Sequence, residues 1–196
     1  MADFRLRVTY AETGRLVMLS HLEIARALER AVRRAGLPYA VSQGFSPHMK
    51  QAFGSALPVG VGGLEEIFDV SLTDYVPPEE ALARLRASSA PDLMPHAARY
   101  ITKDETAASA AYPRSTYEAL LEASRSGDCE MDVLAAAHEL SLPSEITVVR
   151  KKKERVLVPS EFVVGELEVE PAEPGEEGQS RALVRFTLES KASGSL

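Results

Sequence analysis

The amino-acid sequence predicts an α+β protein made of two ferredoxin-like (βαββαβ-type) units, the second degenerate or truncated. Three observations support this fold class. Residues 1–101 follow the order strand, helix, strand, strand, helix, strand, which is that of a split βαββαβ unit. Residues 102–111 (TKDETAASAA) are small and polar, as in a linker. Residues 112–196 repeat much of the first pattern, but no final helix can be found in them.

The most clearly predicted element of the first unit is a helix over residues 21–35. Ser20 and Glu23 have the spacing of a capping box at its start, and Gly36 is suited to its end. One face carries an apolar stripe and the opposite face carries arginines. The remaining elements are strands at 3–10, 66–72 and 93–101, with a short helix at 79–88.

Residues 39–61 are rich in glycine and proline but also contain large apolar side chains. We interpret them as two short extended pieces, at about 39–43 and 50–56, joined by the loop GFSPHMK. This loop places an aromatic ring, an imidazole and a cation close together, in Phe45, His48 and Lys50. Such a combination is suited to contact with an anionic or aromatic ligand.

The second half shows weaker patterns. We expect a strand at 116–123, where a helix is the alternative, and a helix at 131–140. Further strands are expected in four segments, namely 146–149, 155–158, 162–169 and 182–188.

Composition limits the classes of function. The chain has 196 residues, 45% apolar residues and a single cysteine, so an internal disulfide is excluded and a cytoplasmic location is expected. No apolar run is long enough for a membrane span. The net charge of −7 is uneven: residues 1–60 carry eight basic and four acidic residues, or +4, which leaves −11 for the rest. This asymmetry indicates either a face for an anionic partner or an ordinary solvated helix.

The segment SHLEIARALERAVRRAGLPYAVSQGFSPHMKQAFGSALPVG, residues 20–60, resembles the signature of the radical SAM-linked protein family. This is a bacterial domain of unknown function, fused to or encoded beside cobalamin-binding-type radical SAM proteins. The chain departs from the family pattern at Glu23, where aspartate is usual, and at Met49, where a second proline is usual and whose absence is expected to loosen the loop. The resemblance implies a radical SAM partner but no reaction. Family members usually run further, so a shortened chain is expected.

Within this signature we select candidate ligand-binding residues that combine a helix start, basic side chains and the loop. If the loop adjoins the helix start, they form one phosphate-binding pocket. These candidates are Ser20, His21, Arg26, Arg30, Phe45, His48 and Lys50. A secondary basic patch is formed by Arg150, Lys151, Lys152 and Lys153.

Several kinds of chemistry are not expected. Cys129 alone cannot hold an iron–sulfur cluster, which normally requires several cysteine thiolates, and a closed zinc site lacks ligands. No catalytic residue, metal or cofactor is therefore assigned. His96 and His138 have no motif context and are expected to be structural or solvated.

Three functions remain. The first is a non-catalytic substrate-binding or adaptor module for a radical SAM partner, binding RNA or a ribonucleoprotein. The second is a pure protein–protein interaction domain. The third, by analogy of architecture alone, is a ferredoxin-like endoribonuclease or other enzyme.

Overall fold

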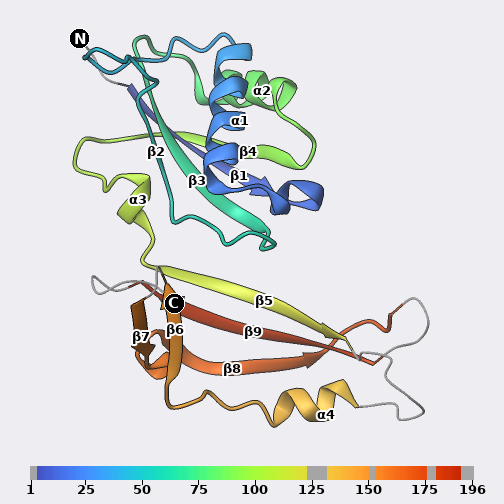
Figure 1. Cartoon of the computed structure of the whole chain (residues 1–196). Helices are drawn as coiled ribbons and strands as arrows, with labels where there is room; N and C mark the ends of the chain where they lie inside the picture. The colour runs from blue at the N-terminus through green and yellow to red at the C-terminus, as the bar shows by residue number, and fades with distance from the viewer. Residues whose placement is uncertain (1–3, 123–131, 151–152, 176–179, 191–196) are drawn as a thin grey trace. The chain divides into compact units, whose positions relative to one another are not determined.

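The computed structural model is a mixed α+β protein that divides into two compact units, Met1–Tyr112 and Pro113–Leu196. The structure describes residues 4–122, 132–150, 153–175 and 180–190 (Figure 1). None of the helices in these ranges is long and apolar enough to cross a membrane.

The first unit contains one antiparallel sheet in the order β2-β3-β1-β4. Its elements follow the predicted strand–helix–strand–strand–helix–strand order, with one short helix added inside and one after it. They are β1 (Phe4–Glu12), the 3-10 helix η1 (Gly14–Met18), α1 (His21–Arg34), β2 (Gln51–Phe53), β3 (Gly63–Leu72), α2 (Pro78–Ser88), β4 (Leu93–Ile101) and α3 (Ala108–Ala111).

Helix α1 begins where the capping box predicts it to begin. Glu23 Oε2 accepts hydrogen bonds from Ser20 N at 2.8 Å and from Ser20 Oγ at 2.7 Å, so the first turn is tied to the residue before it. The helix ends before Gly36, whose φ of +63° is a left-handed conformation that glycine adopts without strain. The apolar stripe is buried at Ile24, Leu28, Ala31 and Val32.

One face of the sheet packs against α1 and α2 (Figure 1). Alternate residues of β1 and β3 point to this face, because side chains of a strand alternate between its two sides. Leu6, Val8 and Phe68 are fully buried there, together with Leu28 of α1 and Leu85 of α2. This is the main hydrophobic core of the first unit.

The opposite face carries a buried ion pair. Arg7 Nε lies 2.7 Å from Asp69 Oδ1, and Arg7 Nη2 lies 3.0 Å from Asp69 Oδ2. Both residues are about 95% buried, with exposed fractions of 5% and 4%. Arg7 also donates to Thr106 O at 2.7 Å, and Asp69 accepts from Ala108 N at 2.8 Å.

Residues 102–111, predicted as a linker, make backbone contacts with the sheet of the first unit. They belong to the first unit, and part of this segment covers the ion pair on the sheet face that the predicted fold would leave free. The small, polar side chains of this segment are typical of a linker, which is why the sequence predicted one. The hydrogen bonds instead use backbone groups, which composition does not reveal.

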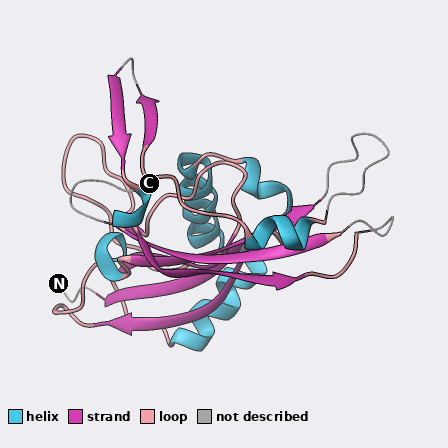
Figure 2. Cartoon of the chain, turned by 90° about the horizontal axis from the view of Figure 1, so that it is seen from below, coloured by secondary structure: helices cyan, strands magenta, loops and turns pink. Residues whose placement is uncertain are grey.

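The second unit has a three-stranded antiparallel sheet, β5-β9-β8, and a separate two-stranded hairpin, β6–β7 (Figure 2). Its elements are β5 (Arg114–Glu122), α4 (Val133–His138), β6 (Ile146–Arg150), β7 (Lys153–Leu157), the 3-10 helix η2 (Pro159–Glu161), β8 (Val163–Pro171) and β9 (Arg181–Glu189). The predicted strands and helix are thus present, although Ala123 of the first predicted strand and Met131 of the predicted helix lie outside the described residues.

A second ferredoxin-like unit is not confirmed. Among the described residues, no helix separates β8 from β9, and these strands pair directly. The last strand, β9, is therefore the central strand of this sheet, and the first strand, β5, lies at an edge. In a βαββαβ sheet the first strand is an inner strand and the last lies at an edge.

The two faces of this sheet differ sharply. On one face Arg185 pairs with Glu118 and Glu168 across the strands. On the other face Val184 packs with Val133 of α4. This alternation follows from the strand period of two and defines one polar and one apolar face.

We predict that Asp69→Asn destabilises the first unit by about 3–5 kcal/mol, because it leaves the buried Arg7 cation without its counter-charge. Urea unfolding followed by circular dichroism measures the loss. Trypsin should also cut more rapidly after Lys103, because the covering segment is held less firmly. Glu80→Gln, which breaks the exposed Arg84–Glu80 pair, is the control and should cost less than about 0.5 kcal/mol. Equal effects of the two substitutions would contradict the assigned role of Asp69.

Candidate functional site

The signature residues lie toward opposite ends of α1. The helix starts after the end of β1, and the chain leaving it reaches Tyr39, which pairs with Leu72 at the end of β3. The GFSPHMK loop projects beyond that second end (Figure 1). Ser20 and His21 therefore do not adjoin the loop, and the single pocket expected from the sequence is not formed.

Backbone pairing anchors the base of the loop to the sheet. Lys50 N donates to Ala40 O at 2.9 Å, Ala40 N donates to Ser71 O at 2.8 Å, and Ser71 N donates to Lys50 O at 3.0 Å. Met49 is 2% exposed and belongs to the hydrophobic core. The departure from proline at this position therefore does not leave the base loose, because the methionine side chain anchors it.

The loop is closed by its own hydrogen bonds. Ser42 N donates to His48 O at 2.8 Å, and His48 N donates to Ser42 Oγ at 3.1 Å. His48 Nδ1 lies 3.2 Å from Ser46 O. The same nitrogen lies 3.0 Å from Ser42 Oγ, so the imidazole ring is held against the loop by two residues.

Phe45 at the tip of the loop is completely exposed, with a relative exposure of 112%. His48 and Lys50 are exposed on the same loop. The last turn of α1, at the same end of the unit, carries the exposed residues Arg33 and Arg34. The loop residues 42–50 therefore form a fixed surface with one aromatic ring and cationic or titratable neighbours. We call it the signature loop.

The remaining candidates of the helix have other surroundings. His21 makes an edge-on contact with Phe53, with ring centroids 5.5 Å apart. Phe53 stacks in turn on Phe68 of the core. Arg26 and Arg30 are exposed on the outer face of α1. His21 thus packs against the core, whereas the arginines face solvent as predicted.

Two carboxyl groups that the sequence analysis did not select are buried or partly buried in the first unit. Glu12 is 5% exposed, and burial raises its pKa. Burial, together with the charge of Glu12, raises the pKa of Glu66 from an ordinary value of 4.5 to about 6. Glu66 lies two residues before Phe68 and four before Val70, both buried, so it is on the same face of β3. This position in the alternating pattern was the signal in the sequence that Glu66 faces the core.

The secondary basic patch is only partly described. Arg150 and Lys153 end β6 and begin β7, where they are paired in register. Lys151 and Lys152 lie outside the described residues. Within the described ranges, no group of three or more His, Cys, Asp or Glu residues could hold a metal ion.

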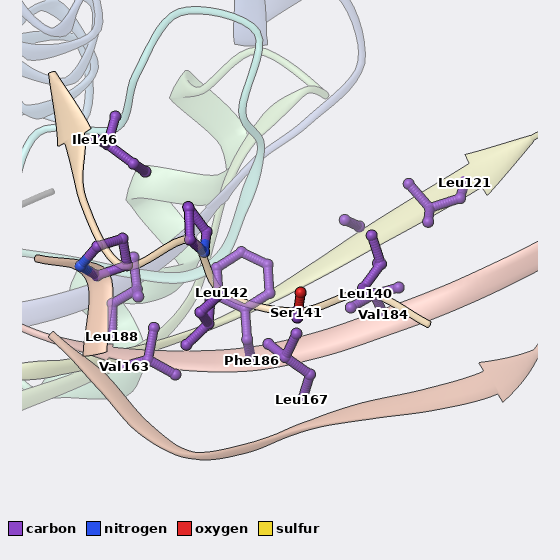
Figure 3. Close-up of a pocket in the computed structure, with 13 residues that line it drawn as sticks. Leu121, Leu140, Ser141, Leu142, Ile146, Val163, Leu167, Val184, Phe186 and Leu188 are labelled. Atoms are coloured by element: carbon purple, nitrogen blue, oxygen red, sulfur yellow. The ribbon is translucent and has the colours of Figure 1, made fainter. Parts of the chain in front are cut away.

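The second unit contains an apolar pocket with a volume of 370 Å³ (Figure 3). It lies between the apolar face of the β5-β9-β8 sheet and residues 140–143, which follow α4. Ser141 is the only polar residue among the 13 that line it. Sequence reasoning missed this site because its residues are ordinary core types spread over much of the unit.

The chain belongs to the family described as an uncharacterized protein conserved in bacteria (DUF2344), whose model matches residues 5–188. No curated protein sequence matches it. Among solved structures, it is similar to an unknown protein from Galdieria sulphuraria, with 14% identity over 95% of this chain and 82% of that chain. The TM-score of 0.30 is too low to establish a shared fold.

We predict that Glu66→Gln stabilises the protein above pH 6 by about 1–2 kcal/mol. The folded state of the wild type holds a proton on Glu66 up to about pH 6, whereas the unfolded state releases it near 4.5. Wild-type stability therefore falls as the pH rises between these values, and the glutamine variant lacks this loss.

Unfolding by urea at a series of pH values between 4 and 8 tests this sign. The control is Glu65→Gln, because the Glu65 side chain is 78% exposed. It should leave both the stability and its pH dependence nearly unchanged. A glutamine variant at position 66 that is less stable than wild type at neutral pH would refute the prediction.

Proposed function

We propose that the protein is a non-catalytic binding or adaptor module whose signature loop binds single-stranded RNA, free or in a ribonucleoprotein, on behalf of a radical SAM partner. The observation that carries this proposal is the full exposure of Phe45 at the tip of a loop that is anchored at its base. An aromatic ring held in water in this way offers both faces to a partner.

The physical chemistry of single-stranded RNA matches this surface. Stacking of a base on an aromatic side chain contributes about 1–3 kcal/mol and requires no particular base. Lys50 adds a phosphate contact, which makes the affinity depend on salt. Because hydrogen bonds between Ser42 and His48 already close the loop, little ordering entropy is lost on binding.

The architecture of the first unit supports the same proposal. We interpret this unit as ferredoxin-like, because β1, α1, β2, β3, α2 and β4 follow the order of that fold and the sheet is fully antiparallel. Many RNA-binding modules of this shape use the free face of the sheet. Here residues 106–108 cover part of that face, so the signature loop is the more accessible surface.

The radical SAM partner and the cytoplasmic location rest on sequence features. The segment from Ser20 to Gly60 resembles the radical SAM-linked signature, and a chain with a single cysteine suits a reducing compartment.

A pure protein–protein interaction domain is the second candidate. It is favoured by the exposed basic ridge of α1, formed by Arg26, Arg30, Arg33 and Arg34. Arg33 already pairs with Glu29 of the same helix. An acidic protein surface would complement the other arginines of this ridge.

We predict that Phe45→Ala and Lys50→Ala each weaken the binding of a labelled single-stranded oligoribonucleotide by about 1 kcal/mol or more. Lys50→Ala should also lower the salt dependence by about one ion, whereas Phe45→Ala should leave it unchanged. Fluorescence anisotropy at two salt concentrations measures both quantities.

Lys103→Ala is the matched control, because it removes an exposed cation elsewhere in the first unit. It should leave the affinity close to that of wild type. Arg30→Ala tests the basic ridge of α1. A loss of RNA affinity would show that the ridge also contacts the RNA, whereas an unchanged affinity would leave the ridge available to an acidic protein surface. Equal affinity for Phe45→Ala, Lys50→Ala and wild type would refute the role of the signature loop, and cleavage of the RNA would refute a non-catalytic module.

A further inference from the structure

The pocket of the second unit is open because its sheet is only partly covered. Helix α4 packs Val133 and Ala137 against one part of the apolar face. Residues 140–143 lie over another part, where Leu140 and Leu142 remain 50% and 42% exposed (Figure 3). The pocket's volume of 370 Å³ is within the range of binding sites, and its lining offers almost only apolar contacts.

Acidic side chains lie around this pocket. Outside the strands of the sheet, the exposed glutamates within two positions of a lining residue are Glu139, Glu145 and Glu161. Because consecutive Cα atoms are about 3.8 Å apart, these residues are at the rim. Arg185 is the only basic residue within two positions of a lining residue, and it pairs with Glu118 on the polar face of the sheet. The rim is therefore acidic, as is the second unit as a whole, in which ten basic and sixteen acidic residues sum to −6.

A surface of complementary composition lies at the start of helix α1. Met18 and Leu22 are 67% and 68% exposed there, and Val59 is 59% exposed. The amide of Gly60 donates to Val17 O at 2.7 Å, which holds Val59 near Met18. Large apolar side chains that are exposed as a cluster, rather than singly, indicate a site of interaction.

Basic side chains follow this cluster along α1. Arg26 and Arg30 lie four and eight residues after Leu22, on the same face of the helix. They are therefore about 6 Å and about 12 Å from Leu22 along the helix axis. Both are exposed, and neither forms an ion pair within the described part of the chain. The α1 surface thus has an apolar anchor followed by cations at fixed spacing, and the pocket with its acidic rim has the opposite charge.

We propose that copies of this protein associate by docking the start of α1 of one copy into the second-unit pocket of another. Met18 and Leu22 enter the pocket, and Arg26 and Arg30 face its acidic rim. This contact does not depend on RNA binding, because the signature loop lies toward the other end of α1. Each copy has one helix surface and one pocket, so both are available to the same assembly.

The charge of the rim favours a second copy over other ligands. A fatty acid has an aliphatic chain for the pocket, but its carboxylate meets the glutamates of the rim, and like charges brought together oppose binding. RNA is disfavoured for the same reason, because its phosphates are anionic. The α1 surface supplies an apolar anchor and cations on a helix that is already folded, so little conformational entropy is lost on docking.

The test uses the full-length protein and sedimentation equilibrium at low salt over a range of concentrations. The wild type should associate reversibly to a mass above that of the monomer, and added salt should weaken the association. Leu22→Asn should weaken it about tenfold, because it removes a leucine from an apolar site. Leu120→Asn is the matched control and should associate as wild type does, since Leu120 is 55% exposed on β5 but does not line the pocket.

Reversal of charge on each side gives a sharper test. One variant combines Arg26→Glu with Arg30→Glu, and the other combines Glu139→Arg with Glu145→Arg. In each variant alone, the helix and the rim have the same sign of charge, so association should weaken about tenfold or more. In an equimolar mixture, the acidic helix of the first variant meets the basic rim of the second, and the basic helix of the second meets the acidic rim of the first. Association should therefore return in the mixture.

Two further controls reverse exposed charges elsewhere. Lys103→Glu does so in the first unit, and Glu170→Arg does so on β8, at a position that does not line the pocket. Both should associate as wild type does. Circular dichroism checks that every variant is folded.

Three results would overturn the proposal. The first is a wild-type protein that stays monomeric at every concentration; binding of a synthetic leucine–lysine peptide or of laurate by that monomer would assign the pocket to another protein or to a lipid. The second is an association that neither Leu22→Asn nor the charge reversals weaken, which would place the contact on another surface. The third is a mixture of the two charge-reversed variants that associates no better than either alone, since α1 and the rim would then not be partners.

Discussion

The buried ion pair between Arg7 and Asp69 determines how the first unit is assembled. The two residues are directly opposite each other on the neighbouring strands β1 and β3. A slip of one residue in this register would move one partner to the other face of the sheet and leave a buried charge alone. Buried ion pairs often add little net stability compared with apolar residues. We therefore attribute to this pair the selection of one strand register and of the docking position of residues 106–108.

This docking restricts where the first unit can meet a partner. With one sheet face packed against helices and part of the other beneath residues 106–108, the exposed signature loop becomes the most distinctive surface. The signature itself combines two roles. Gly60, whose amide donates to Val17 O, belongs to the packing of the first unit, whereas Phe45 makes no contribution to a core. A dense sequence signature therefore need not mark a single site.

The elements of both units could be predicted because their hydrophobic periods and caps are local, as the capping box of Ser20 and Glu23 illustrates. The positions of the loop and of residues 102–111 could not be predicted in this way. Both depend on hydrogen bonds of backbone groups to distant segments, such as the bond from Ala108 N to Asp69 Oδ2. Every residue type has these backbone groups, so the composition of a segment does not predict such bonds. The pocket was missed for a related reason. Leucine and valine have the same pattern over a filled core as over an open pocket. Among the described residues, the two are distinguished by the lack of a second helix over this sheet.

The contact between Arg7 and Thr106 also affects when the first unit can complete its folding during synthesis. The two residues are 99 positions apart in the chain, and a ribosome releases the chain from its N-terminus at a limited rate. Arg7 leaves the ribosome early but acquires its last partner only when β4 and the segment after it have followed. The first unit therefore closes late in its own synthesis, just before Pro113 begins the second. Until then the outer sheet face stays hydrated, and nascent-chain binding factors have access to it.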